Sequence, residues 1–517
     1  MSEKEYIVTL NKNVDYAAFN QEMIATTGAG DIPSRSVVVA NARPGSQRNT
    51  HYMLTVEEAA TLAADSRVLA VELRPDLRDD IQLVRRAVQT GDFSKTLEDR
   101  GFFINWGLRR INEETNPYEN DAVNGNYNYT LDGTGVDIVI QDSGLQVDHP
   151  EFQDANGVSR VQQIDWYAES GLPGTMPTAH YTDYDGHGTH VAGIATGKVY
   201  GWAKGANIYS VKVAGLEGPT DPNVGIPVVD CFDIITAWHN AKPIDPATGY
   251  KRPTIVNMSW GYGALYTAPT AINYRGVSHT GTEIDEVSEL SAYGLILINS
   301  STPGYYRSPV RITSVDVDVQ EMIDAGIHVC IAAGNSYHKI DVTGGDDYDN
   351  NLTNDFSGTI YYNRGSSPFS EEANIVGNID SEINEDTLEQ KALSSESGPG
   401  VSIYAPGTNI MSCTSTVNRF APNIGPYPPN DNFSITNISG TSMAAPQVAG
   451  VIALNAQINP NLTPAQAKAF LNNVAATNVI HTTSLTNDYA DHRSIKGSNN
   501  KFVFNKFNSA VQLRIGN

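Results

Sequence analysis

The feature that most constrains this chain is a series of short apolar runs, each of which ends in glycine and a polar residue. Four of them are GVDIVIQDSG, ANIYSVKVAG, PTIVNMSWG and GIHVCIAAGN, with helical patterns such as VVDCFDIITAWHNAK and DVDVQEMIDAG between them. Alternating strands and helices predict an α/β fold, in which helices cover both faces of a parallel sheet. Reactive groups in such sheets gather at the carboxyl ends of the strands. We therefore look for chemistry in the polar residues that follow the apolar runs.

Residues 1–78 predict a smaller α+β domain. The strand EYIVTL, a helical pattern, a hairpin from SRSVVVANA and HYMLTV, a helix that starts with the capping-box sequence TVEE, and the strand VLAVEL give the order βαββαβ. The stretch 79–104 is charged and poorly patterned, and we interpret it as a linker or a pair of surface helices. The α/β domain then covers 105–475, and 476–517 form a C-terminal extension.

The charge and hydropathy of the chain exclude several classes of function. Acidic residues number 58 against 34 basic ones, and a net charge of -24 repels phosphate backbones and anionic lipids. No apolar run reaches the ~18 residues of a spanning helix, and the start MSEKEYIVTL lacks the parts of a secretory signal. We therefore expect no nucleic-acid or membrane partner, and an intracellular or particle-associated protein.

The run DGHGTHVAG places His187 three positions before His190. Two interpretations compete, a pair of metal ligands on one helical turn or a single catalytic base at the start of a helix. A zinc pair calls for a third ligand and an acid near it, as in the His-Glu-x-x-His pattern, and neither the spacing nor the glutamate of that pattern is present. We therefore predict that His187 projects into a cleft from a helix of small residues, and that His190 is hydrogen-bonded within the core.

Three further residues complete a possible reaction centre. Ser442, in ISGTSMAAPQVAGVIAL, stands at a helix start, but its hydroxyl becomes nucleophilic only if a base takes the proton and a carboxylate orients that base. Asp142 ends an apolar run and can be that carboxylate, although a lone aspartate there can also merely turn the chain. Asn335 closes GIHVCIAAGN and can donate to an oxyanion, although an isolated asparagine is more often a turn former.

The blocks QDSGLQVDHPEF, DGHGTHVAG, NMSWG, AAGN and SGTSMAAPQVAG resemble the signature motifs of the subtilisin-like serine proteases, in the family's order Asp, His, Asn, Ser. The resemblance covers about 105–475 and is nearest to the proteinase K type, because the longer loop that carries a calcium site in secreted bacterial subtilisins is missing. Residues 5–76 are similar to the inhibitory I9-type propeptide of the family. The resemblance implies a three-layer fold with a parallel sheet between helices.

The resemblance also implies an activity and a role for each residue. The chain is expected to be a serine endopeptidase, in which Asp142 orients His187, His187 is the general base and acid, Ser442 attacks the carbonyl, and Asn335 stabilises the oxyanion with the Ser442 N–H. Its partners are polypeptide substrates and its own N-terminal domain, which inhibits it as a zymogen, and the chemistry needs no cofactor. The alternative is a latent or inactive scaffolding protein that retains the fold. The residues that match the substrate-binding strands are Ser259, Trp260, Gly261, Ala332, Ala333 and Gly334.

Two long insertions depart from the family pattern, near 262–315 and 336–370. The first is rich in tyrosine and turn residues, and we hypothesise that it rims the cleft and restricts which peptides enter; a neutral surface excursion is the alternative. The second is oxygen-rich, which permits a structural Ca²⁺, but it does not fit the Asp-x-Asp-x-Asp-Gly loop and can equally be a solvated acidic turn. Its oxygen-bearing residues are Asp346, Asp347, Asp349 and Asn351.

Overall fold

The structure is a computed structural model of the 517-residue chain. It describes residues 3–25, 35–43, 45–78, 82–85, 105–113, 129–178, 180–216, 225–266, 269–284, 287–295, 297–299, 305–354, 358–383, 388–417, 425–428, 430–482 and 492–506. Within these ranges, every helix is too short or too polar to cross a membrane.

The N-terminal domain is a four-stranded antiparallel sheet with two helices. Its elements are β1 (Lys4–Leu10), α1 (Tyr16–Ile24), β2 (Val38–Asn41), β3 (Asn49–Leu54), α2 (Val56–Ala63) and β4 (Val68–Leu73). The strand order is β2-β3-β1-β4. The predicted order βαββαβ is therefore confirmed. Thr55 and Glu58 form the capping box that starts α2, and Phe19, Tyr52 and Leu62 are buried in the core of this domain.

A larger and mostly parallel sheet forms the centre of the second unit. Its strands are β6 (Asp137–Asp142), β7 (Val161–Gln162), β8 (Asn207–Lys212), β9 (Thr254–Met258), β15 (His328–Ala332), β18 (Asn374–Ile383), β19 (Glu389–Lys391), β20 (Ile403–Pro406), β24 (Ala476–Thr477) and β25 (Lys501–Phe502). They follow the order β24-β25-β20-β18-β15-β9-β6-β8-β7, with β19 attached to β18. Every residue of β6, β9 and β15 is buried, as expected of unbroken apolar runs inside a parallel sheet.

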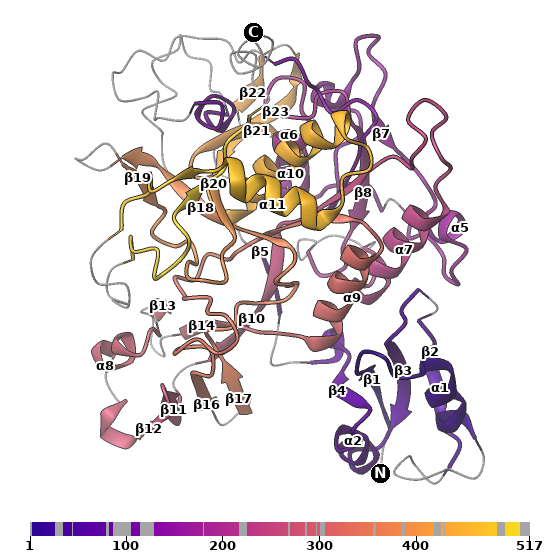
Figure 1. Ribbon diagram of the computed structural model, residues 1–517, viewed down its shortest axis with the longest axis vertical. Helices are drawn as coiled ribbons and strands as arrows, with labels where there is room; N and C mark the ends of the chain where they lie inside the picture. Colours follow the sequence, from indigo (N-terminus) through magenta and orange to yellow (C-terminus); the bar gives the residue numbers. More distant parts are fainter. Residues whose placement is uncertain are drawn as a thin grey trace.

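Two helix pairs pack on this unit. Helices α6 (His187–Thr196) and α10 (Thr441–Ile458) pack against each other and against the sheet. Helices α7 (Val228–Ala241) and α9 (Thr313–Asp324) form the second pair, and α9 also contacts β1 and β4 of the N-terminal domain (Figure 1). The predicted α/β fold is confirmed. The N-terminal domain contacts its helix α9.

The two insertions fold together as one unit rather than as separate surface loops. In the first insertion lie β11 (Ala271–Tyr274), β12 (Val277–Thr280), α8 (Val287–Ala292), β13 (Leu297–Asn299) and β14 (Tyr305–Pro309), and in the second lie β16 (Asn351–Asn354) and β17 (Gly358–Tyr361). Strand β11 pairs antiparallel with β16, so that Ile272 faces Leu352. Both side chains share a small buried core with Tyr266, Tyr306 and Tyr362, which explains why the insertions are rich in tyrosine.

The C-terminal segment belongs to the central sheet. Strand β25 pairs in parallel with β20, and β24 pairs antiparallel with β25. Phe502 and Val503 are fully buried in the main core. Asn505 continues the attachment, because its N–H donates to the carbonyl of Ile111 at 2.8 Å. The described parts of this segment, 476–482 and 492–506, are therefore an integral part of the α/β unit.

Strand β10 (Trp260–Tyr266) follows β9 and enters a separate antiparallel sheet of order β13-β14-β10-β5. Its fourth member, β5 (Gln82–Arg85), lies in the stretch that the sequence predicts as a linker or a helix pair. The alternative of a helix pair is wrong for these four residues, because the edge of β10 supplies hydrogen-bonding partners that a local pattern does not reveal. The rest of the proposed linker, 79–81 and 86–104, lies outside the described residues.

Candidate active site

Strand β6 delivers Asp142 to the carboxyl edge of the central sheet, where its carboxylate meets His187. The Asp142 Oδ1 lies 2.8 Å from His187 Nδ1, and both side chains are 1% exposed. The same oxygen accepts the N–H of Ser143 at 2.7 Å. A carboxylate at Nδ1 selects the tautomer that carries its proton there and leaves Nε2 as the basic nitrogen. The pair is therefore arranged as an oriented base.

A second aspartate, Asp183, fixes the start of α6. Its carboxylate accepts the N–H groups of Asp185 at 3.0 Å, Gly186 at 2.8 Å and Thr189 at 2.9 Å. It also accepts the hydroxyl of Ser143 at 3.0 Å, next to Asp142. The loop after β6 and the first turn of α6 are thus both hydrogen-bonded to one buried carboxylate. The sequence analysis missed Asp183, whose signal was its place two residues before the DGHGTH run.

The small residues of α6 allow its close approach to that loop. A Cβ added at Gly188 would lie 2.2 Å from the carbonyl oxygen of Gly144, and one at Gly193 would lie 2.1 Å from the hydroxyl of Ser412. Either contact would push the helix away from its neighbours. Glycine at these two positions therefore sets the depth at which His187 sits.

His190 lies on the same helix but in a different environment. Its Nε2 lies 3.1 Å from the carbonyl oxygen of Ile410 on β21 (Ile410–Thr414) and 3.0 Å from that of Thr436 on β23 (Asn430–Ile438). Burial lowers the pKa of His190 to about 3, so that the imidazole is neutral. This is the core role that the sequence predicts for His190.

Ser442 stands in the first turn of α10, after Gly440. Its hydroxyl donates to the carbonyl of Ser259 at 3.0 Å, and the hydroxyl of Ser259 donates back to the carbonyl of Ser442 at 3.0 Å. Pro446 has no N–H to donate to the Ser442 carbonyl, as residue i+4 of a helix normally does, and the Ser259 hydroxyl takes its place. Transfer of the Ser442 proton to an imidazole requires the hydroxyl to turn away from Ser259.

The amide of Asn335 is held in one orientation by Thr441, the residue before Ser442. The Asn335 Oδ1 accepts the N–H of Thr441 at 3.0 Å and its hydroxyl at 3.2 Å. The opposite end of the amide, Nδ2, is buried and has no hydrogen-bond partner among the described residues. An NH₂ group that is fixed and unpartnered can donate to a developing negative charge without reorganisation.

The predicted substrate-binding residues lie where β9 passes into β10 and where β15 ends: Ser259 stands between the two strands, Trp260 and Gly261 begin β10, Ala332 ends β15, and Ala333 and Gly334 follow it. Residues Ala332 and Ala333 are buried, and Gly334 adopts a φ of 128° that favours glycine. A Cβ at Gly334 would lie 2.5 Å from the carboxylate of Glu396. The segment 332–334 directly precedes Asn335 in the chain. Ser259 is hydrogen-bonded to Ser442.

Strand β10 has one covered face and one glycine-rich face. On the covered face, Trp260, Tyr262, Ala264 and Tyr266 are all buried. Because side chains alternate along a strand, the remaining residues share the opposite face. They are Gly261, Gly263 and Leu265, and Leu265 is 42% exposed.

One edge of β10 is paired with β5. The two strands are antiparallel, with Trp260 opposite Arg85, Gly261 opposite Val84, Tyr262 opposite Leu83, and Gly263 opposite Gln82. Backbone pairing of this kind depends on main-chain groups, so any extended segment can form it. A stretch that follows the N-terminal domain therefore occupies this edge of β10.

Buried ion pairs attach the N-terminal domain to α7 and α9. Arg43 is fully buried, and its guanidinium lies 2.6 Å from Asp233 on α7 and 3.0 Å from Asp318 on α9. Asn49 Nδ2 donates to the same Asp318 at 2.8 Å. These partners lie in separate segments without a common periodic pattern, and the sequence analysis did not identify them.

A glutamate of the N-terminal domain also caps a helix of the α/β unit. Glu72 accepts the N–H groups of Thr313 at 3.2 Å and Ser314 at 3.0 Å, in the first turn of α9. Burial raises the pKa of Glu72, while these two backbone hydrogen bonds lower it. The cap thus satisfies helix N–H groups that would otherwise lack an acceptor.

Two aspartates in the acidic stretch of the second insertion form ion pairs with arginine and lysine side chains of the same chain. Asp347 is bonded to Arg275 at 2.7 Å and to Lys339 at 2.7 Å, and Asp349 to Arg364 at 2.5 Å. Among the described residues, no three His, Cys, Asp or Glu side chains are grouped so that they could hold a metal ion. The carboxylates of Asp347 and Asp349 are therefore engaged in ion pairs.

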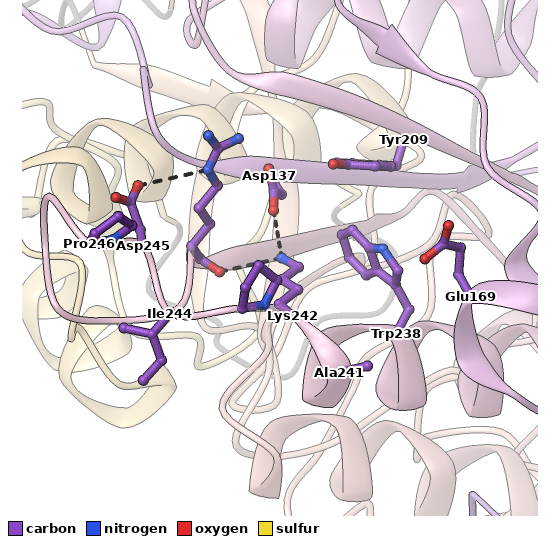
Figure 2. Close-up of a pocket in the computed structure, with 11 residues that line it drawn as sticks. Asp137, Glu169, Tyr209, Trp238, Ala241, Lys242, Ile244, Asp245 and Pro246 are labelled. Atoms are coloured by element: carbon purple, nitrogen blue, oxygen red, sulfur yellow. Dashed lines mark hydrogen bonds and ion pairs between the residues drawn. The ribbon is translucent and has the colours of Figure 1, made fainter.

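A cavity of about 490 Å³ lies at the other end of β6 from Asp142 (Figure 2). Its lining includes Asp137, the first residue of β6, with Tyr209, Trp238 and Lys242. Lys242 Nζ lies 2.6 Å from the Asp137 carboxylate and 4.1 Å from the centre of a Trp238 ring. Five steps of ~3.3 Å along the strand separate this cavity from the Asp142–His187 pair. The cavity is therefore remote from the candidate active site.

Comparison with known proteins adds a family. A model described as the subtilase family matches residues 133–504. An extracellular serine proteinase of Thermus sp. (strain Rt41A) is 26% identical over 419 residues, which are 80% of this chain and 72% of the Thermus protein. A subtilisin-like serine protease of Aspergillus niger is 27% identical, over 70% of this chain and 50% of the Aspergillus protein.

A solved structure supports the fold. Fervidolysin from Fervidobacterium pennivorans, a keratinolytic enzyme related to subtilisin, aligns with a TM-score of 0.51 at 17% identity, over 99% of this chain and 61% of fervidolysin. At this level of identity, the likeness concerns the fold alone. The chain thus spans most of the Thermus relative but only about half to three fifths of the other two proteins.

Proposed function

Because this chain belongs to the subtilase family of serine peptidases, we propose that it is a serine endopeptidase that is made as a zymogen. The observation that carries the proposal is the buried hydrogen bond between Asp142 and His187, on a helix that packs against the helix of Ser442. An imidazole oriented by a carboxylate next to a serine at a helix start suits acyl transfer.

The chain's own residues supply each step. His187 Nε2 takes the proton of Ser442 as its oxygen attacks the peptide carbonyl, and Asp142 stabilises the resulting imidazolium. The oxyanion accepts hydrogen bonds from Asn335 Nδ2 and from the N–H of Ser442, which lies in the first turn of α10 and has no acceptor within the helix. His187 then protonates the leaving amine and later activates the water that hydrolyses the acyl-enzyme. No cofactor takes part.

The substrate is a polypeptide that binds in an extended conformation. Its backbone pairs with Ser259 and with Trp260 and Gly261 at the start of β10, and residues 332–334 form the opposite wall of the pocket. Gly261 carries no side chain, which leaves space beside β10 for a side chain of the substrate.

The N-terminal domain is the inhibitor of the zymogen. Its support is the pairing of β5 with four residues of β10, together with the attachment of the domain to α7 and α9. A cut within 79–104 separates the domain from the enzyme. We propose that the domain is of the I9 type, and the missing loop after DGHGTHVAG supports a likeness to proteinase K.

A second candidate is a latent or inactive scaffolding protein that retains the subtilase fold. Two observations favour it, the occupied edge of β10 and the Ser442 hydroxyl that donates to Ser259. Both are also features of an uncut zymogen, and the intact set of Asp142, His187, Asn335 and Ser442 favours the enzyme.

A fluorophosphonate probe distinguishes the two. The purified protein should react at Ser442, and Ser442→Ala should abolish the reaction, whereas Ser170→Ala, a serine at the end of α5 (Trp166–Ser170), should leave it unchanged. N-terminal sequencing should find a mature chain that begins within 79–105. An intact chain that neither reacts with the probe nor cleaves a peptide library would support the scaffolding protein.

A further inference from the structure

Strand β14 places Arg307 beside the strand that binds the substrate backbone. In the antiparallel pair β10–β14, Leu265 lies opposite Arg307 and Gly263 opposite Pro309. Directly opposed residues of an antiparallel pair project from the same face of the sheet. Arg307 therefore shares the glycine-rich face of β10 with Gly261, Gly263 and Leu265.

The side chain of Arg307 reaches across Gly263. A Cβ added at Gly263 would lie 3.4 Å from Cγ and 3.5 Å from Cδ of Arg307. Because Cγ and Cδ already lie over β10, the side chain extends beyond its own strand β14. Glycine at 263 thus leaves room for the arginine stem above the substrate-binding strand.

The guanidinium of Arg307 has no acidic partner among the described residues, although it is partly buried. Its Nε is buried and without a hydrogen-bond partner in the part of the chain that the structure describes. Burial lowers the pKa of Arg307, and no carboxylate of these described residues acts in the opposite direction. A buried charge without a counter-ion is costly, so this site favours an anion.

Other arginines of the same region are all paired. Those in the insertions or next to them form ion pairs with aspartates: Arg275 with Asp347, Arg311 with Asp316, and Arg364 with Asp349. In an acidic chain with a net charge of -24, a partly buried arginine without such a partner stands apart from these neighbours.

The register of β5 shows how a peptide would approach Arg307. Gln82 lies opposite Gly263 and Val84 opposite Gly261. A substrate residue at the register position of Gln82 would project from the same face as Arg307, and only Gly263 would lie between them. A carboxylate at this position therefore meets the guanidinium without an intervening side chain.

We propose that Arg307 is a specificity-determining residue that binds the carboxylate of an aspartate or glutamate side chain in the substrate, at the position that pairs with Gly263. The inference rests on the proposed function, since it names a substrate class for the same cleft. Guanidinium and carboxylate form charge-assisted, often bidentate hydrogen bonds, which a glutamine of similar shape cannot reproduce.

Quenched fluorescent peptides test this inference. Glutamate, glutamine or lysine is moved one position at a time through the residues on the amino side of the scissile bond, and kcat/KM is measured. At one position, glutamate should exceed glutamine by about tenfold, with lysine below both. Arg307→Gln should bring the glutamate-to-glutamine ratio to about one, and Arg307→Glu should favour lysine. Arg252→Gln, which alters an exposed arginine, should leave the ratio unchanged.

The outcomes separate this inference from the proposed function. Reaction of Ser442 with the fluorophosphonate, but equal rates for glutamate and glutamine peptides at every position, would overturn the inference alone. Peptide binding to the Ser442→Ala protein, measured by fluorescence anisotropy, does not depend on turnover. A glutamate preference in binding without any reaction of Ser442 would support the inference and contradict the enzyme. If Ser442 does not react and no preference for glutamate is found, both the inference and the proposed function are overturned.

Discussion

The two ends of the chain attach to the α/β unit by different kinds of contact. The N-terminal domain is held by buried charges, in which Arg43 pairs with Asp233 and Asp318 and Glu72 caps α9. The C-terminal segment is held by backbone pairing of β25 with β20 and by apolar burial of Phe502.

The difference fits the proposed fates of the two ends. A buried ion pair gains little over its hydrated, separated ions, because desolvation offsets most of the attraction, so such contacts position more than they stabilise. Apolar burial has no such offset and contributes about 25 cal/mol per Å². The N-terminal contacts are thus suited to a domain that leaves, and the C-terminal contacts to a segment that stays.

Replacing Arg43 by methionine should produce the largest effect. The change leaves two carboxylates buried without their cation, which costs about 3–5 kcal/mol of docking free energy. Hydrogen exchange in β1–β4 should accelerate, and the fluorophosphonate should react faster with Ser442. Arg67→Met, whose partners Asp65 and Glu22 lie within the N-terminal domain, is the control and should leave docking unchanged. Unaltered exchange in Arg43→Met would show that the ion pairs do not hold the domain.

Phe502→Ala should weaken the attachment of the C-terminal segment to the α/β unit. It removes a fully buried ring whose face lies 4.2 Å from the Arg110 guanidinium, and we expect a loss of about 3 kcal/mol in the free energy of unfolding of the α/β unit. Chemical denaturation measures this loss. Val417→Ala, at a residue that is 46% exposed, should change it little. If both variants unfold alike, the C-terminal segment is not part of the folding unit.

Glu72→Ala should have a smaller effect on docking. It leaves the N–H groups of Thr313 and Ser314 without their acceptor, at a cost of about 2 kcal/mol. Amide exchange at these two residues should speed up, and Glu72→Gln, which keeps one acceptor, should lie between the variant and the natural protein. Equal exchange in all three proteins would contradict the cap.

The smallest effect should come from pH. Burial lowers the pKa of His338 from 6.5 to about 4, and this residue follows Tyr337, whose carbonyl accepts from Lys496 of the C-terminal segment. A depressed pKa contributes stability that is present above pH 6.5 and is lost as the pH falls toward 4. The free energy of unfolding should therefore drop on acidification. His338→Gln should reduce the drop at pH 5.5 by about 1 kcal/mol, and an unchanged pH profile would contradict this role.

The sequence predicted those parts of the fold that follow from local patterns. Buried parallel strands such as β6 and β15 are continuous apolar runs, and the polar residue after each run marks the edge of the sheet where Asp142 and Asn335 lie. The capping box at Thr55 was equally visible, because its two hydrogen bonds join residues three positions apart.

The sequence could not predict contacts that join distant segments. Asp183 and Arg43 are polar residues whose partners are set by tertiary packing, and no periodicity marks them. Strand β5 lies in a charged stretch and takes its conformation from the edge of β10. The strands of the insertions could not be predicted from local patterns, because the pairing of β11 with β16 joins residues that lie far apart in the chain.

The two hydrogen bonds from Thr441 to the amide of Asn335 have a mechanical consequence. Thr441 is covalently bonded to Ser442, so a small displacement at the beginning of α10 carries the Ser442 side chain and the Asn335 amide in the same direction. Thermal vibration can then shift both groups while the spacing between the Ser442 oxygen and the amide nitrogen is conserved. In the proposed mechanism, the alignment of nucleophile and oxyanion donor is protected by shared movement rather than by immobility.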